Sequence, residues 1–242
     1  MIYSAEGNLG YLVRGLLLSS VLFVGLACCP HASAAKPCLG QGEPRAVFVG
    51  DSLTWGHGPR NSWPTKLAGM CGWHEVLNDG RGGTGLFANG HGTSASYINR
   101  VPTEVAPFSP SIVFITSYFN DTDHTPSDLA TALAALIDAV HALPTHPTVV
   151  VTGIYDPTGV NGAPYTQIDP ALRAVCVQRT VPFIEPRTGT VYDSSGKGTD
   201  VGGPWITEAN KAHYISDDGF HPNDDGLVYV AQRTFDAIQA LS

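Results

Sequence analysis

Short, fully apolar runs alternate with amphipathic helical patterns along most of this chain, and this alternation constrains its fold most. Residues 111–117 (SIVFITS) and 148–152 (TVVVT) are rich in β-branched side chains and contain almost no charged position. Runs of this kind are typical of strands that are buried on both faces of a sheet. Because helical patterns separate them, the sequence predicts a parallel sheet with helices covering both faces.

The pattern predicts nine principal elements in one domain. Strands are expected at residues 45–50, 75–77, 111–117, 148–152 and 182–185, and helices at residues 61–70, 127–143, 170–179 and 226–241. Thr125, Pro126 and Asp128 give the second helix a cap, a first-turn proline and a capping-box acid. The last helix is expected to direct a single stripe of side chains inward, namely Leu227, Val230, Ala231, Phe235 and Ile238.

The N-terminal segment has the pattern of a secretory signal peptide. Arg14 precedes an apolar stretch at residues 15–27 that is too short to span a bilayer comfortably, and Ala32-Ser33-Ala34 has the small-x-small pattern of a cleavage site. We therefore expect a signal peptide over residues 1–34, a single domain over residues 35–242, a secreted protein and no stable membrane span. Leu26-Ala27-Cys28-Cys29 resembles a bacterial lipobox, so a lipid-anchored form is the weaker alternative.

Composition and charge exclude several classes of protein and partner. The chain has 242 residues, of which 43% are hydrophobic and 14% charged, so it can form a sizeable core. Its net charge is −8 and it has no basic run, which argues against nucleic acid as a partner. No cofactor motif is convincing, and Pro126 occupies the invariant glycine position of the calcium-loop pattern that begins at Asp121. We expect a monomer without a metal or cofactor.

Polar residues that can perform catalysis follow the predicted strands. Ser52 comes directly after the first strand, where a helix N-terminus favours a developing anion, although a serine here is often only a helix cap. His221 lies three residues after Asp218, close enough for the carboxylate to orient the imidazole. A histidine base must be neutral, so activity is expected to rise near pH 6–7.

Two further segments carry potential hydrogen-bond donors for an oxyanion. Residues 78–85 (NDGRGGTG) follow the second strand, and their glycines can bring bare backbone N–H groups close to a reacting atom. Gly80, Gly82 and Gly85 formally match a dinucleotide-binding fingerprint, but no clear helix opens behind them. Asn120 follows the third strand and can offer a side-chain N–H, although an Asn-Asp pair is also a common turn former.

Together these blocks resemble the SGNH (GDSL-type) hydrolase family. The resemblance covers Gly50-Asp51-Ser52-Leu53, residues 78–84, Asn120-Asp121 and residues 218–222, in the family's order. It implies a flavodoxin-like three-layer α/β/α fold with a five-stranded parallel sheet of order 2-1-3-4-5. It also implies a catalytic triad of Ser52, Asp218 and His221. The implied oxyanion hole consists of Ser52, Gly83 and Asn120.

Two details depart from a simple transfer of the family's pattern. Gly83 has the usual spacing from Asn78, but Gly82 and Gly85 remain alternatives for the backbone donor. Tyr118 stands where the third block normally has glycine, which is expected to affect the backbone at Asn120 and to narrow the acyl pocket.

The sheet order implied by the resemblance also predicts a disulfide. Cys38 and Cys71 precede adjacent strands at the edge opposite the site, whereas Cys176 lies on a more distant helix. We expect a Cys38–Cys71 bridge in the oxidising environment outside the cell, and a buried free thiol at Cys176.

The resemblance implies a serine esterase that acts on acyl or acetyl esters of lipids, glycans or small molecules. Trp55, Tyr118 and Trp205 are candidate substrate contacts, because the polar segment around Trp205 precedes the triad acid. An acyltransferase or thioesterase on the same triad is an alternative. A binding module that has lost turnover is another, favoured only by Tyr118.

Overall fold

The computed structural model describes residues 38–40, 43–92, 95–116, 118–160, 162 and 164–241. Contacts divide the chain into two units, Met1–Ala35 and Lys36–Ser242, and every described residue belongs to the second. The expected signal peptide, residues 1–34, therefore lies outside the described residues. Among the described residues, no helix combines the length and apolar character needed to cross a bilayer.

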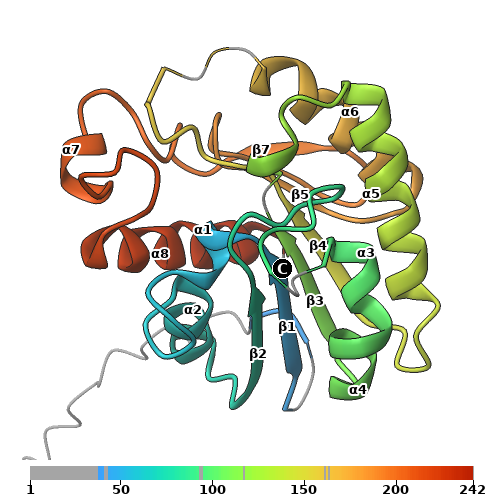
Figure 1. Cartoon of the computed structure of the whole chain (residues 1–242). Helices are drawn as coiled ribbons and strands as arrows, with labels where there is room; N and C mark the ends of the chain where they lie inside the picture. The colour runs from blue at the N-terminus through green and yellow to red at the C-terminus, as the bar shows by residue number, and fades with distance from the viewer. Residues whose placement is uncertain are drawn as a thin grey trace, which may run out of the picture. The chain divides into compact units, whose positions relative to one another are not determined.

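A single sheet organises the second unit, and its parallel part has the expected order β2-β1-β3-β4-β5 (Figure 1). These strands are β1 (Arg45–Gly50), β2 (Glu75–Gly80), β3 (Ile112–Thr116), β4 (Thr148–Thr152) and β5 (Phe183–Glu185). Every residue of β3 is buried, as its β-branched sequence predicts.

The sheet has seven strands rather than the expected five. β6 (Thr190–Tyr192) and β7 (Gly198–Asp200) continue it beyond β5 in antiparallel orientation. They escaped sequence analysis because three residues are too few to show an alternating pattern, and because all three residues of β7 are exposed. Gly189 permits the turn into β6, because its φ is +71° and a Cβ there would lie 1.9 Å from the Gly203 carbonyl oxygen.

The helices pack in two groups, α2 with α8 and α5 with α6, and Figure 1 shows these groups on opposite sides of the sheet. The helices are α1 (Ser52–Trp55), α2 (Trp63–Cys71), α3 (Tyr97–Arg100), α4 (Ala106–Phe108), α5 (Pro126–His141), α6 (Tyr165–Gln178), α7 (Lys211–Tyr214) and α8 (Asp224–Leu241). A π-helical turn, Val101–Val105, joins α3 to α4, and a 3₁₀ turn, Phe119–Asp121, follows β3.

Two helix predictions differ from the structure at particular residues. α6 begins five positions before the expected start, so Pro170 lies inside the helix instead of opening it. Proline favours the first helical turn but does not require it, which is why the boundary was misplaced. In α8, Thr234 is buried, whereas Phe235 is only partly buried.

Large aromatic side chains fill the core beneath β1 and β3. Phe48 stacks on Phe114 at 4.7 Å between ring centroids and meets Trp63 edge-on at 5.3 Å. These contacts hold the central strands in register and press α2 onto the sheet. The carboxyl ends of the strands, where the candidate site lies, are thereby placed on a rigid support.

The expected cysteine chemistry is confirmed. Cys38 and Cys71 form a disulfide with a Cα–Cα distance of 5.5 Å, and Cys176 is a buried free thiol. Burial raises the pKa of Cys176 to about 12, so this thiol is unreactive at neutral pH.

Candidate active site

Ser52, His221 and Asp218 lie in one hydrogen-bonded row although 169 residues separate the serine from the histidine. Ser52 Oγ is 2.9 Å from His221 Nε2, and His221 Nδ1 is 2.6 Å from Asp218 Oδ2. An ionised Asp218 accepts a hydrogen bond from the Nδ1–H group of His221, which leaves Nε2 unprotonated as the acceptor for the serine hydroxyl. The arrangement can therefore withdraw a proton from Ser52.

The turn between β1 and α1 presents Ser52 at the first position of the helix. Asp51 caps this helix, because its side chain accepts the Leu53 N–H at 2.9 Å. The adjoining strand ends require glycine: a Cβ on Gly50 would lie 2.0 Å from Thr54 Oγ1, and one on Gly80 would lie 2.3 Å from the Trp55 nitrogen. The serine thus lies at a close junction of β1, β2 and α1.

A tight turn before α8 places Asp218 against His221. One carboxylate oxygen of Asp218 accepts the backbone N–H groups of Phe220 and His221 at 2.9 and 3.0 Å, and the other faces the imidazole. These backbone hydrogen bonds, together with the imidazole contact, lower the pKa of Asp218 to about 2. The residue is therefore ionised at any pH at which the protein is expected to act.

The expected oxyanion donors come from three different loops. Asn120 Nδ2 donates to the Thr84 carbonyl at 2.9 Å and so ties the third block to the second. Within the described residues, the backbone N–H groups of Ser52 and Gly83 have no protein acceptor. Gly83 has a φ of +72°, a conformation that favours glycine, whereas a Cβ on Gly85 would lie 2.0 Å from an Asp121 oxygen. Gly85 thus has a packing role, and Gly83 fits the donor role better.

Two buried charged residues that organise this site were missed by sequence analysis. Asp121 accepts the backbone N–H groups of residues 86–88 at 2.6 to 3.1 Å and so holds the loop that follows Gly83. Arg100 is 1% exposed, donates to the carbonyls of Gly50 and Asp79, and pairs with the Asp79 carboxylate at 3.2 Å. The Asn120-Asp121 pair in the sequence is a signal that could have identified Asp121. Nothing in the sequence around Arg100 indicates that this arginine is buried.

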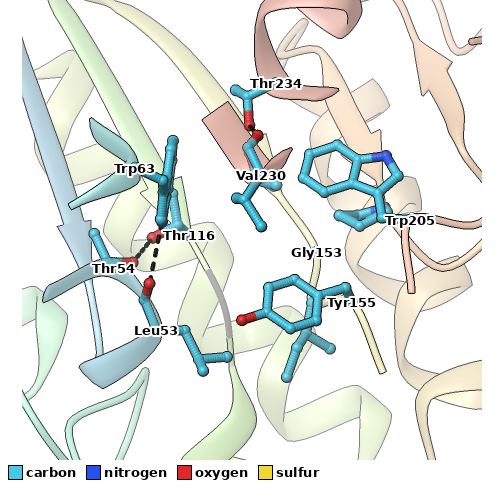
Figure 2. A pocket seen from close by; sticks show the side chains of 12 residues that line it. Leu53, Thr54, Trp63, Thr116, Gly153, Tyr155, Trp205, Val230 and Thr234 are labelled. Carbon is cyan, nitrogen blue, oxygen red and sulfur yellow. Dashed lines mark hydrogen bonds between the residues drawn. The ribbon is translucent and has the colours of Figure 1, made fainter. Parts of the chain in front are cut away.

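The three candidate substrate contacts occupy different environments. Trp55 is 40% exposed and lines a surface groove with Arg81 and Glu104. Tyr118, which was expected to narrow the acyl pocket, is 1% exposed, and its hydroxyl donates to Asp169. Its ring fills the core, and the hydroxyl pairs with a buried carboxylate. Trp205 is also 1% exposed and lines a small, partly open cavity (Figure 2).

No group of three or more metal-binding side chains occurs among the residues that the structure describes. The hydrogen-bonded row consists of a serine, a histidine and an aspartate, with the expected N–H donors on adjoining loops. Such an arrangement can carry out acyl transfer through the serine oxygen.

Comparisons with known proteins point in the same direction as the geometry. The profile of the GDSL-like lipase/acylhydrolase family matches residues 48–227, which spans every block described above. No curated protein matches the sequence significantly.

Solved structures share the fold at low sequence identity. The psychrotrophic esterase EstA from a Pseudoalteromonas species is 15% identical, with a TM-score of 0.60 over 81% of this chain and 97% of that one. A carbohydrate esterase family 2 enzyme from Corynascus thermopiles is also 15% identical, with a TM-score of 0.56 over 85% of this chain and 68% of that one. A two-domain esterase active on acetylated mannans is 16% identical, with a TM-score of 0.57 over 82% of this chain and 50% of that one.

Proposed function

The chain belongs to the GDSL-like lipase/acylhydrolase family, and from this premise we propose that it is a secreted serine esterase which hydrolyses carboxylic esters through an acyl-enzyme. The observation that carries the proposal is the 2.9 Å distance between Ser52 Oγ and His221 Nε2, with Asp218 hydrogen-bonded behind the imidazole.

In the proposed first step, Ser52 Oγ attacks the ester carbonyl carbon while His221 accepts the hydroxyl proton. The resulting imidazolium is stabilised by the ionised Asp218 and then donates the proton to the departing alkoxide, which leaves as the alcohol. A water molecule attacks the acyl-enzyme in the second step, with His221 again as base. The acid is released and Ser52 regains its proton.

The negative oxygen of each tetrahedral intermediate needs donors that are already in place. The N–H groups of Ser52 and Gly83 are free of protein acceptors within the described residues, and Asn120 is held beside them through Thr84. Each well-placed donor contributes roughly 3 kcal/mol to stabilisation of the transition state. In this proposal, each of the first three sequence blocks supplies one donor to the oxyanion.

Export of the protein is part of the same proposal. The pattern over residues 1–34 supports it, and the Cys38–Cys71 disulfide suits an oxidising destination. We expect the protein recovered from the culture medium of expressing cells to begin at Ala35. N-terminal sequencing tests this, and a lipid attached at Cys28 would contradict it.

Labelling with a fluorophosphonate probe tests the catalytic proposal directly. The wild type should react covalently at one serine, Ser52→Ala should not react, and His221→Ala should react at least about a hundredfold more slowly because the base is lost. Ser216→Ala is the matched control, since it removes a serine from the neighbouring loop. Rapid labelling of His221→Ala, or labelling of Ser52→Ala, contradicts the proposed roles.

A further inference from the structure

A small, partly open cavity lies beside the carboxyl ends of β3 and β4, between α1 and α8 (Figure 2). Its volume is about 30 Å³. Most of its wall is apolar, with contributions from Leu53, Trp63, Trp205 and Val230. Leu53 directly follows the proposed nucleophile in α1, so the cavity begins one residue away from the reacting serine.

Tyr155 lines this cavity and is influenced by the charges of two carboxylates near the catalytic groups. Its side chain is 95% buried by the fold, and Figure 2 shows its hydroxyl directed across the cavity toward Leu53. Burial raises the pKa of Tyr155, and the negative charges of Asp51 and Asp218 raise it further. These two carboxylates flank Ser52 and His221, so Tyr155 lies within electrostatic reach of both sides of the site.

Two hydroxyl groups in this wall have unfulfilled hydrogen-bonding capacity. The hydroxyls of Tyr155 and Thr152 are buried and have no partner among the residues that the structure describes. A buried polar group without a partner costs about 1–3 kcal/mol. A polar atom of a ligand in the cavity would give these two hydroxyls a partner in an otherwise apolar wall.

We propose that this cavity is the acyl pocket and that Tyr155 restricts it to short acyl groups of the size of acetyl. Its volume of about 30 Å³ exceeds what a single water molecule requires but is far below the roughly 300–1,000 Å³ of pockets for larger ligands, so it suits a small alkyl group. In the proposed acyl-enzyme, the alkyl group of the acyl chain on Ser52 Oγ occupies this cavity, whose wall includes Leu53, Tyr155 and Val230. This inference rests on the proposed esterase function and assigns its substrate class, esters of short-chain acids.

Chain-length selectivity tests the inference. The measured quantity is the ratio of kcat/KM for the p-nitrophenyl esters of hexanoic and acetic acid. The wild type should favour acetate by about tenfold or more, since each methylene that a pocket accepts or rejects changes kcat/KM by that order. Tyr155→Ala should raise the hexanoate-to-acetate ratio about tenfold, because it removes the wall of the pocket.

Matched variants separate loss of the wall from other effects. Tyr155→Phe retains the ring and should keep the wild-type ratio within about twofold, as should Tyr192→Ala, which removes a tyrosine from β6. Leu53→Ala enlarges the same cavity from its opposite side and should shift the ratio in the same direction as Tyr155→Ala. If thermal melting shows that Tyr155→Ala is not folded, Leu53→Ala serves as the test.

The outcomes distinguish this inference from the proposed function. If the wild type labels with fluorophosphonate but hydrolyses hexanoate as fast as acetate, the short acyl pocket is wrong while the esterase proposal stands. An unchanged ratio in both Tyr155→Ala and Leu53→Ala, with labelling intact, also overturns it. If the wild type neither labels nor hydrolyses any ester, the proposed function fails and the inference falls with it.

Discussion

At the scale of single residues, the candidate site depends on carboxylates that have different tasks and different environments. Asp218 is about half exposed and is hydrogen-bonded to His221, whereas Asp121 is fully buried and holds a loop. Both accept several backbone N–H groups, which keeps each side chain in one orientation. Substituting either residue should therefore have distinct, measurable effects.

Replacing Asp218 by asparagine should lower kcat by about 10³–10⁴-fold, because the amide favours the wrong tautomer of His221. Since the pKa of Asp218 is about 2, loss of wild-type activity between pH 8 and 4 is not due to its protonation. The measurement is kcat/KM from pH 4 to 9 for both proteins. The control is Asp217→Asn, which makes the same charge change one residue earlier and should remain active. If Asp218→Asn keeps more than a tenth of the wild-type kcat, Asp218 does not orient His221 as proposed.

Replacing Asp121 by alanine should destabilise the protein by about 2–4 kcal/mol, because three backbone N–H groups lose a charged acceptor. The kcat/KM value should fall as well, since the loop that Asp121 holds leads directly from Gly83. Urea unfolding and ester hydrolysis measure the two effects. The control is Asp123→Ala, which removes an exposed carboxylate nearby. If Asp121→Ala is as stable as Asp123→Ala, the loop does not depend on Asp121.

At the scale of elements, the site and the covalent bridge lie at opposite ends of the same strands. Cys38 precedes β1, and Cys71 ends α2 just before β2 begins. Ser52 instead follows the carboxyl end of β1. The bridge can therefore stabilise the fold without contributing to the geometry of the site.

Replacing both Cys38 and Cys71 by serine should reduce the free energy of unfolding by about 3–4 kcal/mol in the chain-entropy account, because the bridge closes a loop of 33 residues. The kcat/KM value should change by less than about twofold, because the strand ends at the site keep their core support. Urea unfolding and steady-state kinetics provide the two readouts. Cys176→Ala, which leaves the bridge intact, is the control. A count of two or more thiols in the denatured secreted protein contradicts the pairing.

At the scale of the whole molecule, a buried ionic network joins β3, α6 and β5. Asp169 accepts hydrogen bonds from the Tyr118 hydroxyl and from Arg187 at 2.8 Å, and Arg187 also pairs with Glu185 at 2.7 Å. Tyr118, the departure from the family's third block, thus links the loop of Asn120 to this network. The departure has a packing explanation and does not favour a protein that has lost catalysis.

The network makes stability depend on pH in a particular direction. Burial raises the pKa of Asp169 to about 6, despite the opposing effects of Tyr118 and Arg187. A folded-state pKa above the ordinary value of 3.8 favours the protonated form, so this contribution is fully present below about pH 4 and is lost as the pH rises through 6. Asp218, with its lowered pKa, acts in a separate window, because its contribution is lost only as the pH falls from 4 toward 2.

Urea unfolding of wild type and Asp169→Asn from pH 4 to 8 tests this dependence. Between pH 4 and 6, the unfolding free energy of the wild type should fall relative to that of Asp169→Asn, because asparagine does not titrate. Above pH 6 the difference between the two proteins should become constant. Asp236→Asn is the control for removal of a carboxylate, and it should show no such shift over this range. A difference that is independent of pH would show that the pKa of Asp169 is not raised.

The sequence by itself determined the parallel core of the sheet and the order of the catalytic blocks, whereas the cysteine pairing followed from the sheet order that the family resemblance implied. Continuous apolar strands and helical stripes are local patterns; the blocks at Ser52 and Asn120 follow predicted strands, and the block at His221 precedes the predicted last helix. Residues that depend on non-local packing were decided only by the tertiary structure. Arg100 and Asp121 are charged and yet buried, and Tyr118 turns into the core, because partners tens of residues away satisfy them. Local periodicity contains no information about such partners, and the volume behind Tyr155 likewise exists only once α1, α8 and the end of β4 have come together.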